Sequence, residues 1–418
     1  MIEKMFGRSL LAVTSAGVMM MTSSLAYAAT PMPSQEEMWK IIQQQQKQIE
    51  TLTKKLTKTE TQVTQADKKI EATATLVEQT KSGGGNNLGW WNKTQIGGYG
   101  ELHYNGLKDS GDDKVDFHRF VAFISHDFTD SIRFFSELEL EHSLAGDGAP
   151  GEVELEQAFV EFDINDEHQA RAGLFLLPIG ILNETHEPPT FFGVERNPIE
   201  KNIIPTTWWE AGVGANGELG DGFSYNVALH SGLDTPVSGG SAFKIRSGRQ
   251  KVALADADNG AVTAGLKYTG IPGVKLGLTG QYQQDLTQGN FTESVSATLF
   301  EAHADIRKGP WGLRALYARW DLDGAAPATV GRDEQVGWYV EPSYRFDTDL
   351  GEFGVFARYN SYDNEAGNSV DTEYVQYDVG INYWPHPDVV LKADMQFNDD
   401  PAGGEDDEIL NLGVGFRF

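Results

Sequence analysis

The sequence predicts an all-β protein, a 16-stranded antiparallel transmembrane β-barrel preceded by an N-terminal α-helical coiled coil. Three observations lead to this prediction. The chain begins with a segment typical of an export signal. Aliphatic residues then recur at every seventh position, and from Trp90 onward apolar and polar residues alternate in sixteen separate segments.

The composition excludes several classes of protein. The 418 residues include 33 Lys and Arg against 61 Asp and Glu, a formal net charge of −28. Such an acidic chain lacks the clustered cations that bind phosphates, so we expect no nucleic-acid partner. The absence of cysteine excludes thiolate metal sites and cysteine nucleophiles. No mature segment has the roughly 18 consecutive apolar residues of a membrane-spanning helix.

Residues 1–28 are predicted to be a signal peptide. Lys4 and Arg8 precede a mostly apolar stretch from Leu10 to Leu25, and Ala26-Tyr27-Ala28 forms a cleavage site of the A-x-A type. A buried N-terminal helix is the alternative, but the basic residues before the stretch and the small residues after it favour export. The mature protein would then lie beyond the inner membrane of a double-membraned bacterium.

Residues 29–80 are predicted to form a coiled coil in the periplasm. The predicted core residues at a and d positions are Ile42, Ile49, Leu52, Leu56, Val63, Ile70 and Val77. Polar d residues such as Gln45 and Thr59 weaken this core and leave the number of helices open. A single amphipathic helix is the alternative. Residues 81–89 form a Gly/Asn-rich linker to the barrel domain, residues 90–418.

Period-two alternation defines the barrel strands. Leu410, Leu412, Val414 and Phe416, for example, alternate with polar residues and glycines. The sixteen predicted strands are 93–106, 115–128, 131–142, 153–165, 168–177, 208–218, 222–231, 260–269, 273–284, 295–306, 311–321, 335–346, 352–362, 371–384, 388–398 and 408–418. A soluble β-sandwich or propeller would need to bury its apolar faces between sheets, whereas each strand here keeps a polar face that suits a wet lumen.

Short turns alternate with long loops along the chain, as in outer-membrane barrels. Residues 127–130, 165–167 and 385–387 form short turns, whereas residues 178–207, 232–259, 322–334 and 399–407 form long polar loops. Aromatic residues near the strand ends are expected in girdles at the membrane interfaces. They include Trp90, Trp91, Tyr104, Trp311, Trp320, Trp338, Tyr344, Tyr383 and Trp384.

The stretch from Leu155 to Gly214 contains QAFVEFD, ARAGLFLLPIG and a loop bearing Glu195-Arg196. These pieces resemble the phosphate-selective porin superfamily, porins O and P. A coiled coil before the barrel is also similar to that of related trimeric porins. The resemblance implies a sixteen-stranded homotrimer in the outer membrane, with passive passage of solutes.

The long loop 178–207 is the predicted constriction, because porins fold a loop at this place into the lumen. Its six prolines stiffen it, and its polar residues include Glu184, His186, Glu187, Glu195 and Arg196. By strand parity, inward-facing wall residues include Arg119, Arg133, Glu137, Glu139 and Arg171. The alternatives are an exposed loop that contacts a neighbour or lipopolysaccharide, and wall ion pairs that only stiffen the barrel.

These observations predict an outer-membrane porin that passes small hydrophilic solutes or ions. The alternatives are a channel selective for phosphate or another small anion, a sugar or a dicarboxylate, and an anchor to the cell wall. Inward acids are at least as numerous as inward cations, so we expect a weak cation preference or little selectivity. No catalytic or metal-binding motif is found, and no cofactor or metal is expected. Expected partners are two further copies of the chain, membrane lipid and lipopolysaccharide, permeating solutes and, through the coil, peptidoglycan.

Overall fold

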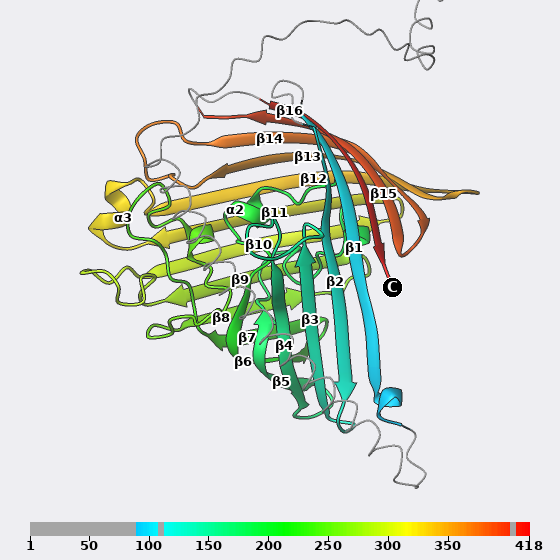
Figure 1. Ribbon diagram of the computed structural model, residues 1–418, viewed down its shortest axis with the longest axis horizontal. Coiled ribbons are helices and arrows are strands. Elements are labelled where there is room, and N and C mark those ends of the chain that lie inside the picture. The colour runs from blue at the N-terminus through cyan, green and yellow to red at the C-terminus, as the bar shows by residue number, and fades with distance from the viewer. Residues whose placement is uncertain (1–88, 108–112, 402–406) are drawn as a thin grey trace, which may run out of the picture. The chain divides into compact units, whose positions relative to one another are not determined.

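The computed structural model describes residues 89–107, 113–401 and 407–418. The predicted signal peptide, the coiled coil with all its core residues, and the linker up to residue 88 lie outside these residues. Within them, sixteen antiparallel strands close into a barrel, because β1 pairs with β16 as well as with β2 (Figure 1). The predicted number of strands is therefore confirmed, and each strand end lies within three residues of its expected position.

The strands are β1 (Thr94–Leu107), β2 (Lys114–Asp127), β3 (Ile132–Glu141), β4 (Val153–Asp163), β5 (His168–Leu176), β6 (Trp209–Gly220), β7 (Phe223–His230), β8 (Ala261–Tyr268), β9 (Val274–Gln283), β10 (Ala297–Lys308), β11 (Trp311–Leu322), β12 (Glu334–Thr348), β13 (Gly351–Asp363), β14 (Tyr374–His386), β15 (Val389–Asp399) and β16 (Asp407–Arg417). The helices are η1 (Trp90–Lys93), η2 (Pro188–Thr190), α2 (Ile199–Asn202), η3 (Ile245–Gly248) and α3 (Ala325–Thr329). In the described part of the chain, no helix is both long and apolar enough to span a bilayer.

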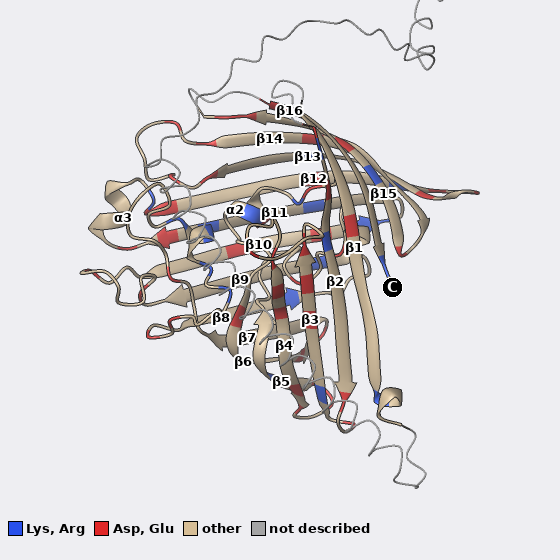
Figure 2. Ribbon diagram, in the orientation of Figure 1, with Lys and Arg blue, Asp and Glu red and all other residues tan. Residues whose placement is uncertain are grey.

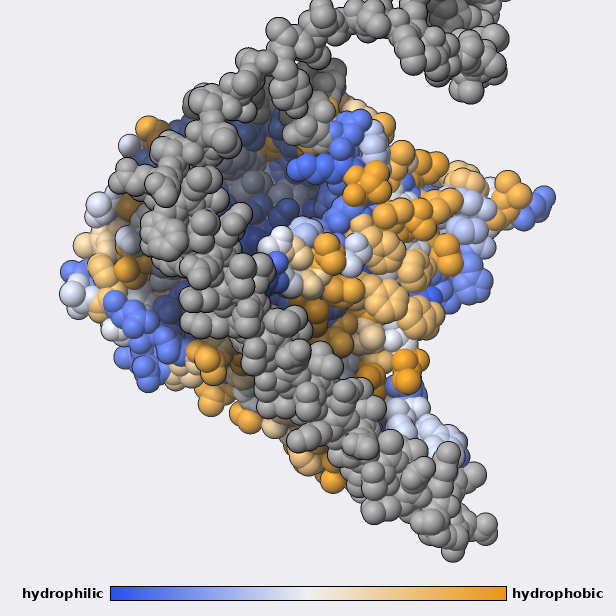
Figure 3. Space-filling view, in the orientation of Figure 1, coloured by the Kyte–Doolittle hydropathy of each residue, from blue (hydrophilic) through white to orange (hydrophobic). Residues whose placement is uncertain are grey.

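The two faces of the sheet are inverted relative to a soluble protein. On β3, Leu138 is 47% exposed, whereas its neighbours Glu137 and Glu139 are 1% and 3% exposed. Figure 3 shows hydrophobic side chains over the outer surface and hydrophilic ones in the hollow of the barrel. Apolar residues face outward because lipid surrounds a transmembrane barrel, and polar residues line its wet interior.

The two ends of the barrel differ in their connections. Seven short turns join β2 to β3, β4 to β5 and each later pair in the same sense, so they share one end, the short-turn end. The longer connections lie at the opposite, long-loop end. Two of these are large enough to fill space inside the barrel, residues 177–208 between β5 and β6 and residues 231–260 between β7 and β8.

Candidate functional site

Residues 177–208 form a loop whose two ends are tied together inside the barrel. Asn183 is fully buried at its base. Its side-chain amide donates hydrogen bonds to the carbonyls of Leu177 and Trp208 at 2.7 and 2.9 Å, and its Oδ1 accepts one from the Trp208 amide at 2.7 Å. The Leu177 amide also donates to the Trp208 carbonyl at 3.1 Å, so backbone and side chain together join the two ends of a loop of about thirty residues. The Asn183 side chain supplies the acceptor for the buried Trp208 amide.

Side chains from the inner wall hold the backbone of this loop. The shortest hydrogen bonds from wall donors to loop carbonyls are Trp384 to Pro189 at 3.2 Å, Arg314 to Thr190 at 3.0 Å, Asn382 to Phe191 at 3.0 Å, Lys392 to Gly193 at 2.8 Å and Trp320 to Ile203 at 3.0 Å. The donors come from β11, β14 and β15. The loop therefore crosses the lumen and rests against the wall on that side, where α2 is seen in Figure 1.

Glycines on the wall allow this close approach. A Cβ atom at Gly415 would lie 2.2 Å from the Cβ of Pro188, and one at Gly354 would lie 2.7 Å from the Phe192 ring. Any larger residue at either position would collide with the loop. The glycines that alternate with apolar residues on β16 thus mark where the loop is seated.

A cavity of about 220 Å³, the outer cavity, lies toward the long-loop end. Its acids are Glu101, Glu139, Glu141, Glu154, Glu156 and Glu195, and its cations are Arg119, Arg196, Lys201, Arg246, Arg249 and Lys251. Most of the acids belong to β1, β3 and β4 (Figure 2), whereas most of the cations come from the two long loops. An acidic wall thus faces a basic set of loops across the cavity.

The loop charges in the outer cavity are fixed by their contacts. Burial raises the pKa of Glu195, but the hydrogen bond with His103 at 3.1 Å, the charges of His103 and His118 and the hydrogen bond from Asn105 together outweigh this effect and lower the pKa to about 2. Burial lowers the pKa of Arg246 to about 10, helped by the neighbouring Arg249. Both groups are therefore charged at neutral pH.

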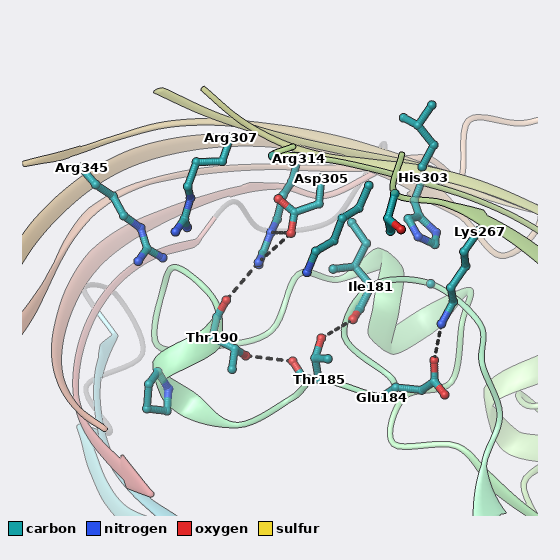
Figure 4. Close-up of a pocket in the computed structure, with 16 residues that line it drawn as sticks. Ile181, Glu184, Thr185, Thr190, Lys267, His303, Asp305, Arg307, Arg314 and Arg345 are labelled. Atoms are coloured by element: carbon teal, nitrogen blue, oxygen red, sulfur yellow. Dashed lines mark hydrogen bonds and ion pairs between the residues drawn. The ribbon is translucent and has the colours of Figure 1, made fainter. Parts of the chain in front are cut away.

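A larger cavity of about 680 Å³, the inner cavity, lies toward the short-turn end. Its lining includes Lys267, Lys275, Arg307, Arg314 and Arg345, but only two acids, Glu184 and Asp305. In Figure 4 the basic side chains extend from the wall strands toward residues 181–190 of the loop. Lys267 pairs with Glu184 at 2.7 Å and Arg314 with Asp305 at 3.2 Å.

The structure brings together only part of the predicted site. Arg119, Glu139, Glu195 and Arg196 meet in the outer cavity, and Glu184 lies in the inner one. His186 and Glu137 are both buried, with 3.5 Å between His186 Nε2 and Glu137 Oε1, and line neither cavity.

The remaining predicted residues lie elsewhere. Arg133 pairs with Glu161 and Asp163 on β4. The Arg171 guanidinium stacks on the Phe175 ring at 4.3 Å. Glu187 is half-buried and lines neither cavity.

The sequence prediction missed two groups of residues that line the cavities. Arg246, Arg249 and Lys251 form a short basic run in an acidic chain, and this run could have identified them as lining residues of the outer cavity. Arg307 and Arg314 follow the same inward parity as Asp305 and could have been found from it. The prediction that Trp320 and Trp384 belong to interfacial girdles is wrong, because both are buried and bind the loop.

Comparisons with known proteins agree with this architecture. The family model described as phosphate-selective porin O and P matches residues 97–398. An uncharacterized protein of Aquifex aeolicus is 31% identical over 362 residues, covering 77% of this chain and 79% of that protein.

Several solved structures share the fold. The outer membrane channel DcaP of Acinetobacter baumannii aligns with a TM-score of 0.56 at 13% identity, covering 78% of this chain and 97% of that chain. The anion-selective porin from Comamonas acidovorans aligns with a TM-score of 0.54 at 12% identity, covering 78% and 99%. In vitro folded OmpT of Vibrio cholerae, in its trimer form, aligns with a TM-score of 0.52 at 11% identity, covering 78% and 99%.

Proposed function

The chain belongs to the phosphate-selective porin O and P family and is a porin of the bacterial outer membrane, and from this premise we propose that its lumen favours small anions, with the preference set at the inner cavity. As the sequence predicts, the protein is a channel and not an enzyme. Solutes cross such a channel passively, so the fixed charges and the width of the lumen decide which ones pass.

The charge of the inner cavity carries this proposal. Its lining has five Lys or Arg residues against two acids. Among the described residues, no carboxylate lies within 4 Å of the charged nitrogens of Lys275 or Arg307, whereas Lys267 and Arg314 are paired. Two cations are thus left to attract an anion that enters from the short-turn end.

Counting the inward charges along the sequence predicts a channel that prefers cations, because the count gives paired and unpaired acids equal weight. Several inward acids are paired with arginine. Glu101 lies 2.6 Å from Arg119, and Arg358 holds both Glu341 at 2.9 Å and Asp378 at 3.0 Å. A paired acid exerts little net field on a passing ion, so the unpaired cations of the inner cavity weigh more than the count suggests.

We further propose that the loop 178–207 constricts the lumen. Glu195 and Arg196 would present charge to the solute from this loop in the outer cavity, opposite Arg119 and Glu139 on the wall. Glu184 would present charge from the same loop in the inner cavity. His186 and Glu137 would hold the loop in place, whereas Arg133, Arg171 and Glu187 would act on solutes only through the general field of the lumen. Facing acids and cations in the outer cavity would orient dipolar solutes before they reach the inner cavity.

The N-terminal predictions complete the proposal. Residues 1–28 would direct export, and the coil 29–80 would lie in the periplasm and support a homotrimer. The trimer form of OmpT, whose barrel has the same fold, is compatible with such an assembly. Contact of the outer loops with lipopolysaccharide and of the coil with peptidoglycan would place the protein between membrane and cell wall.

Planar-bilayer recording across a salt gradient tests the anion preference. We expect a reversal potential on the anion side for the native protein and a shift toward cations for Lys275→Gln and Arg307→Gln. A unit charge about 10 Å from a monovalent ion in water contributes about 0.4 kcal/mol, which attracts an anion and repels a cation, so each substitution should lower the anion-to-cation permeability ratio about fourfold.

Lys308→Gln is the matched control, because it removes a charge next to Arg307 from a residue that does not line the inner cavity. It should leave the ratio unchanged. A cation-side reversal potential for the native protein would overturn the proposed preference. Block of the current by phosphate, but not by a sugar or a dicarboxylate, would favour the phosphate-selective alternative.

A further inference from the structure

Three side chains at the long-loop end come together although they are distant in sequence. Asp116 and His118 lie at the start of β2, and His142 directly follows β3. Asp116 Oδ2 lies 2.7 Å from His142 Nδ1 and 3.3 Å from His118 Nδ1. One potential ligand atom from each residue lies within 4.8 Å of the others.

A β-bulge places Asp116 and His118 on the inner side of the barrel. Between the pairs Glu101–Arg119 and His103–Asp116, β2 has one residue more than β1. Without this bulge, strict alternation from Arg119 would place His118 on the lipid face, yet His118 lines the outer cavity. Bulges are often found where a strand re-aims a side chain near a functional site.

The backbone holds His142 opposite His118. The amide of His142 donates to the carbonyl of His118 at 3.1 Å. His142 itself has φ of 51°, in the left-handed region that few residues other than glycine adopt. On its other side, the His118 ring stacks on His103 with 4.6 Å between centroids and 11° between planes. The backbone thus holds His142 beside His118, and the stacking contact supports the His118 ring on its other face.

We propose that Asp116, His118 and His142 bind a divalent transition-metal ion at the outer mouth of the channel. Two imidazoles and a carboxylate are ligands that zinc, nickel and similar ions prefer, whereas calcium and magnesium prefer oxygen ligands alone. Tetrahedral zinc with bonds near 2.1 Å needs ligand atoms about 3.4 Å apart. Small side-chain rotations of these residues supply that geometry, and water completes the coordination.

The site is open to ions from outside. The side chains of Asp116, His118 and His142 are 27%, 31% and 35% exposed. Because His118 and its stacking partner His103 line the outer cavity, a bound ion would add positive charge beside the acids Glu101 and Glu195. Metal binding would thus alter the charge of the outer mouth without touching the inner cavity.

Zinc binding to the purified full-length protein tests the proposal, measured by competition with a chromophoric indicator. We expect one Zn²⁺ per chain, undiminished by excess Mg²⁺. His118→Ala, His142→Ala and Asp116→Asn should each weaken binding at least as much as the roughly 10–100-fold loss caused by removing an outer-shell partner of a metal ligand. X-ray absorption of the bound zinc should show two imidazole ligands.

His386→Ala is the matched control, since this exposed histidine ends β14 at the opposite end of the barrel, with its Nδ1 3.5 Å from Asp388. It should bind zinc like the native protein. Heat-modifiable mobility on gels establishes that each variant is folded. If the native protein binds no zinc, or if folded His118→Ala and His142→Ala bind it as tightly as the native protein, the cluster is only a hydrogen-bonded tie between β2 and the next loop.

Discussion

Glu200 shows how much a single buried carboxylate contributes to the position of the loop. It is fully buried in α2. Its Oε1 accepts hydrogen bonds from the amides of Ile181 and Leu182, both at 2.6 Å, and its Oε2 accepts from Asn197 at 2.9 Å and from the Tyr339 hydroxyl at 3.1 Å. Both halves of the loop and the wall strand β12 thus meet at one side chain.

We expect Glu200→Gln to destabilise the protein by about 1–3 kcal/mol, because the new NH₂ group would face donors and leave one oxygen's partners unsatisfied. The midpoint of thermal unfolding, followed by heat-modifiable gel mobility, measures this effect. Glu187→Gln makes the same chemical change in the same loop at a half-buried residue and should leave the midpoint unchanged. Equal midpoints for Glu200→Gln and the native protein would contradict the role assigned to Glu200.

Sequence reasoning at this scale succeeds where alternation holds and fails where a side chain has a specific partner. Parity places Arg119 and Glu139 inward, where both line the outer cavity. Trp320 and Trp384 resemble interfacial aromatics because they lie near strand ends, but each has an indole N–H that donates to a loop carbonyl in the lumen. A tryptophan that lies at the membrane interface and one that donates a hydrogen bond to a buried carbonyl have the same local sequence pattern.

The loop 177–208 behaves as one element that is fastened to two sides of the lumen. Wall donors on β11, β14 and β15 hold one side, and His186 contacts the opposite wall. His186 Nε2 lies 3.5 Å from Glu137 on β3 and 3.7 Å from Glu156 on β4, while its Nδ1 is 3.2 Å from the carbonyl of Asn183. This contact is the histidine latch of the loop.

The histidine latch should depend on pH. Burial favours the neutral imidazole, but the contacts with Glu137 and Glu156 outweigh it and raise the pKa of His186 well above its ordinary value. A raised folded-state pKa gives stability that is fully present below the unfolded-state pKa of about 6.5 and is lost as pH rises through the folded-state value.

Comparing the native protein with His186→Gln as a function of pH tests this expectation. The difference between their unfolding midpoints should be constant at acidic to neutral pH and should shrink in alkaline buffer. The same comparison for His386→Gln, at the exposed end of β14, controls for a general effect of histidine loss. A difference that grows as pH rises would rule out the histidine latch.

The existence of this loop could be predicted from its length and its prolines, but its contacts could not. The donors that hold it lie more than a hundred residues further along the chain, as Lys392 does from Gly193. Gly354 and Gly415 look like ordinary strand glycines in the sequence. The structure shows why a larger residue would not fit there, because the loop packs directly against both positions. Such long-range pairings leave no periodic signal.

At the scale of the whole molecule, the barrel is the feature that sequence predicts best, because each strand carries its own period-two pattern. Closure needs only residues from Thr94 onward, since the last strand β16 returns to pair with β1 from Tyr99↔Arg417 to Leu107↔Ile409. The hydrogen bonds of the sheet therefore form a complete ring without the predicted coil.

Deleting residues 29–87 should therefore leave a folded barrel but weaken the trimer. The barrel closes within its own sixteen strands, all of which follow the predicted coil in the sequence. Native gels and heat-modifiable mobility measure assembly and folding separately. We expect folded monomers, because the coil would supply the contacts that join three chains. Folded trimers would instead assign the interface to the outer faces of the strands, and an unfolded product would show that assembly through the coil precedes closure of the barrel.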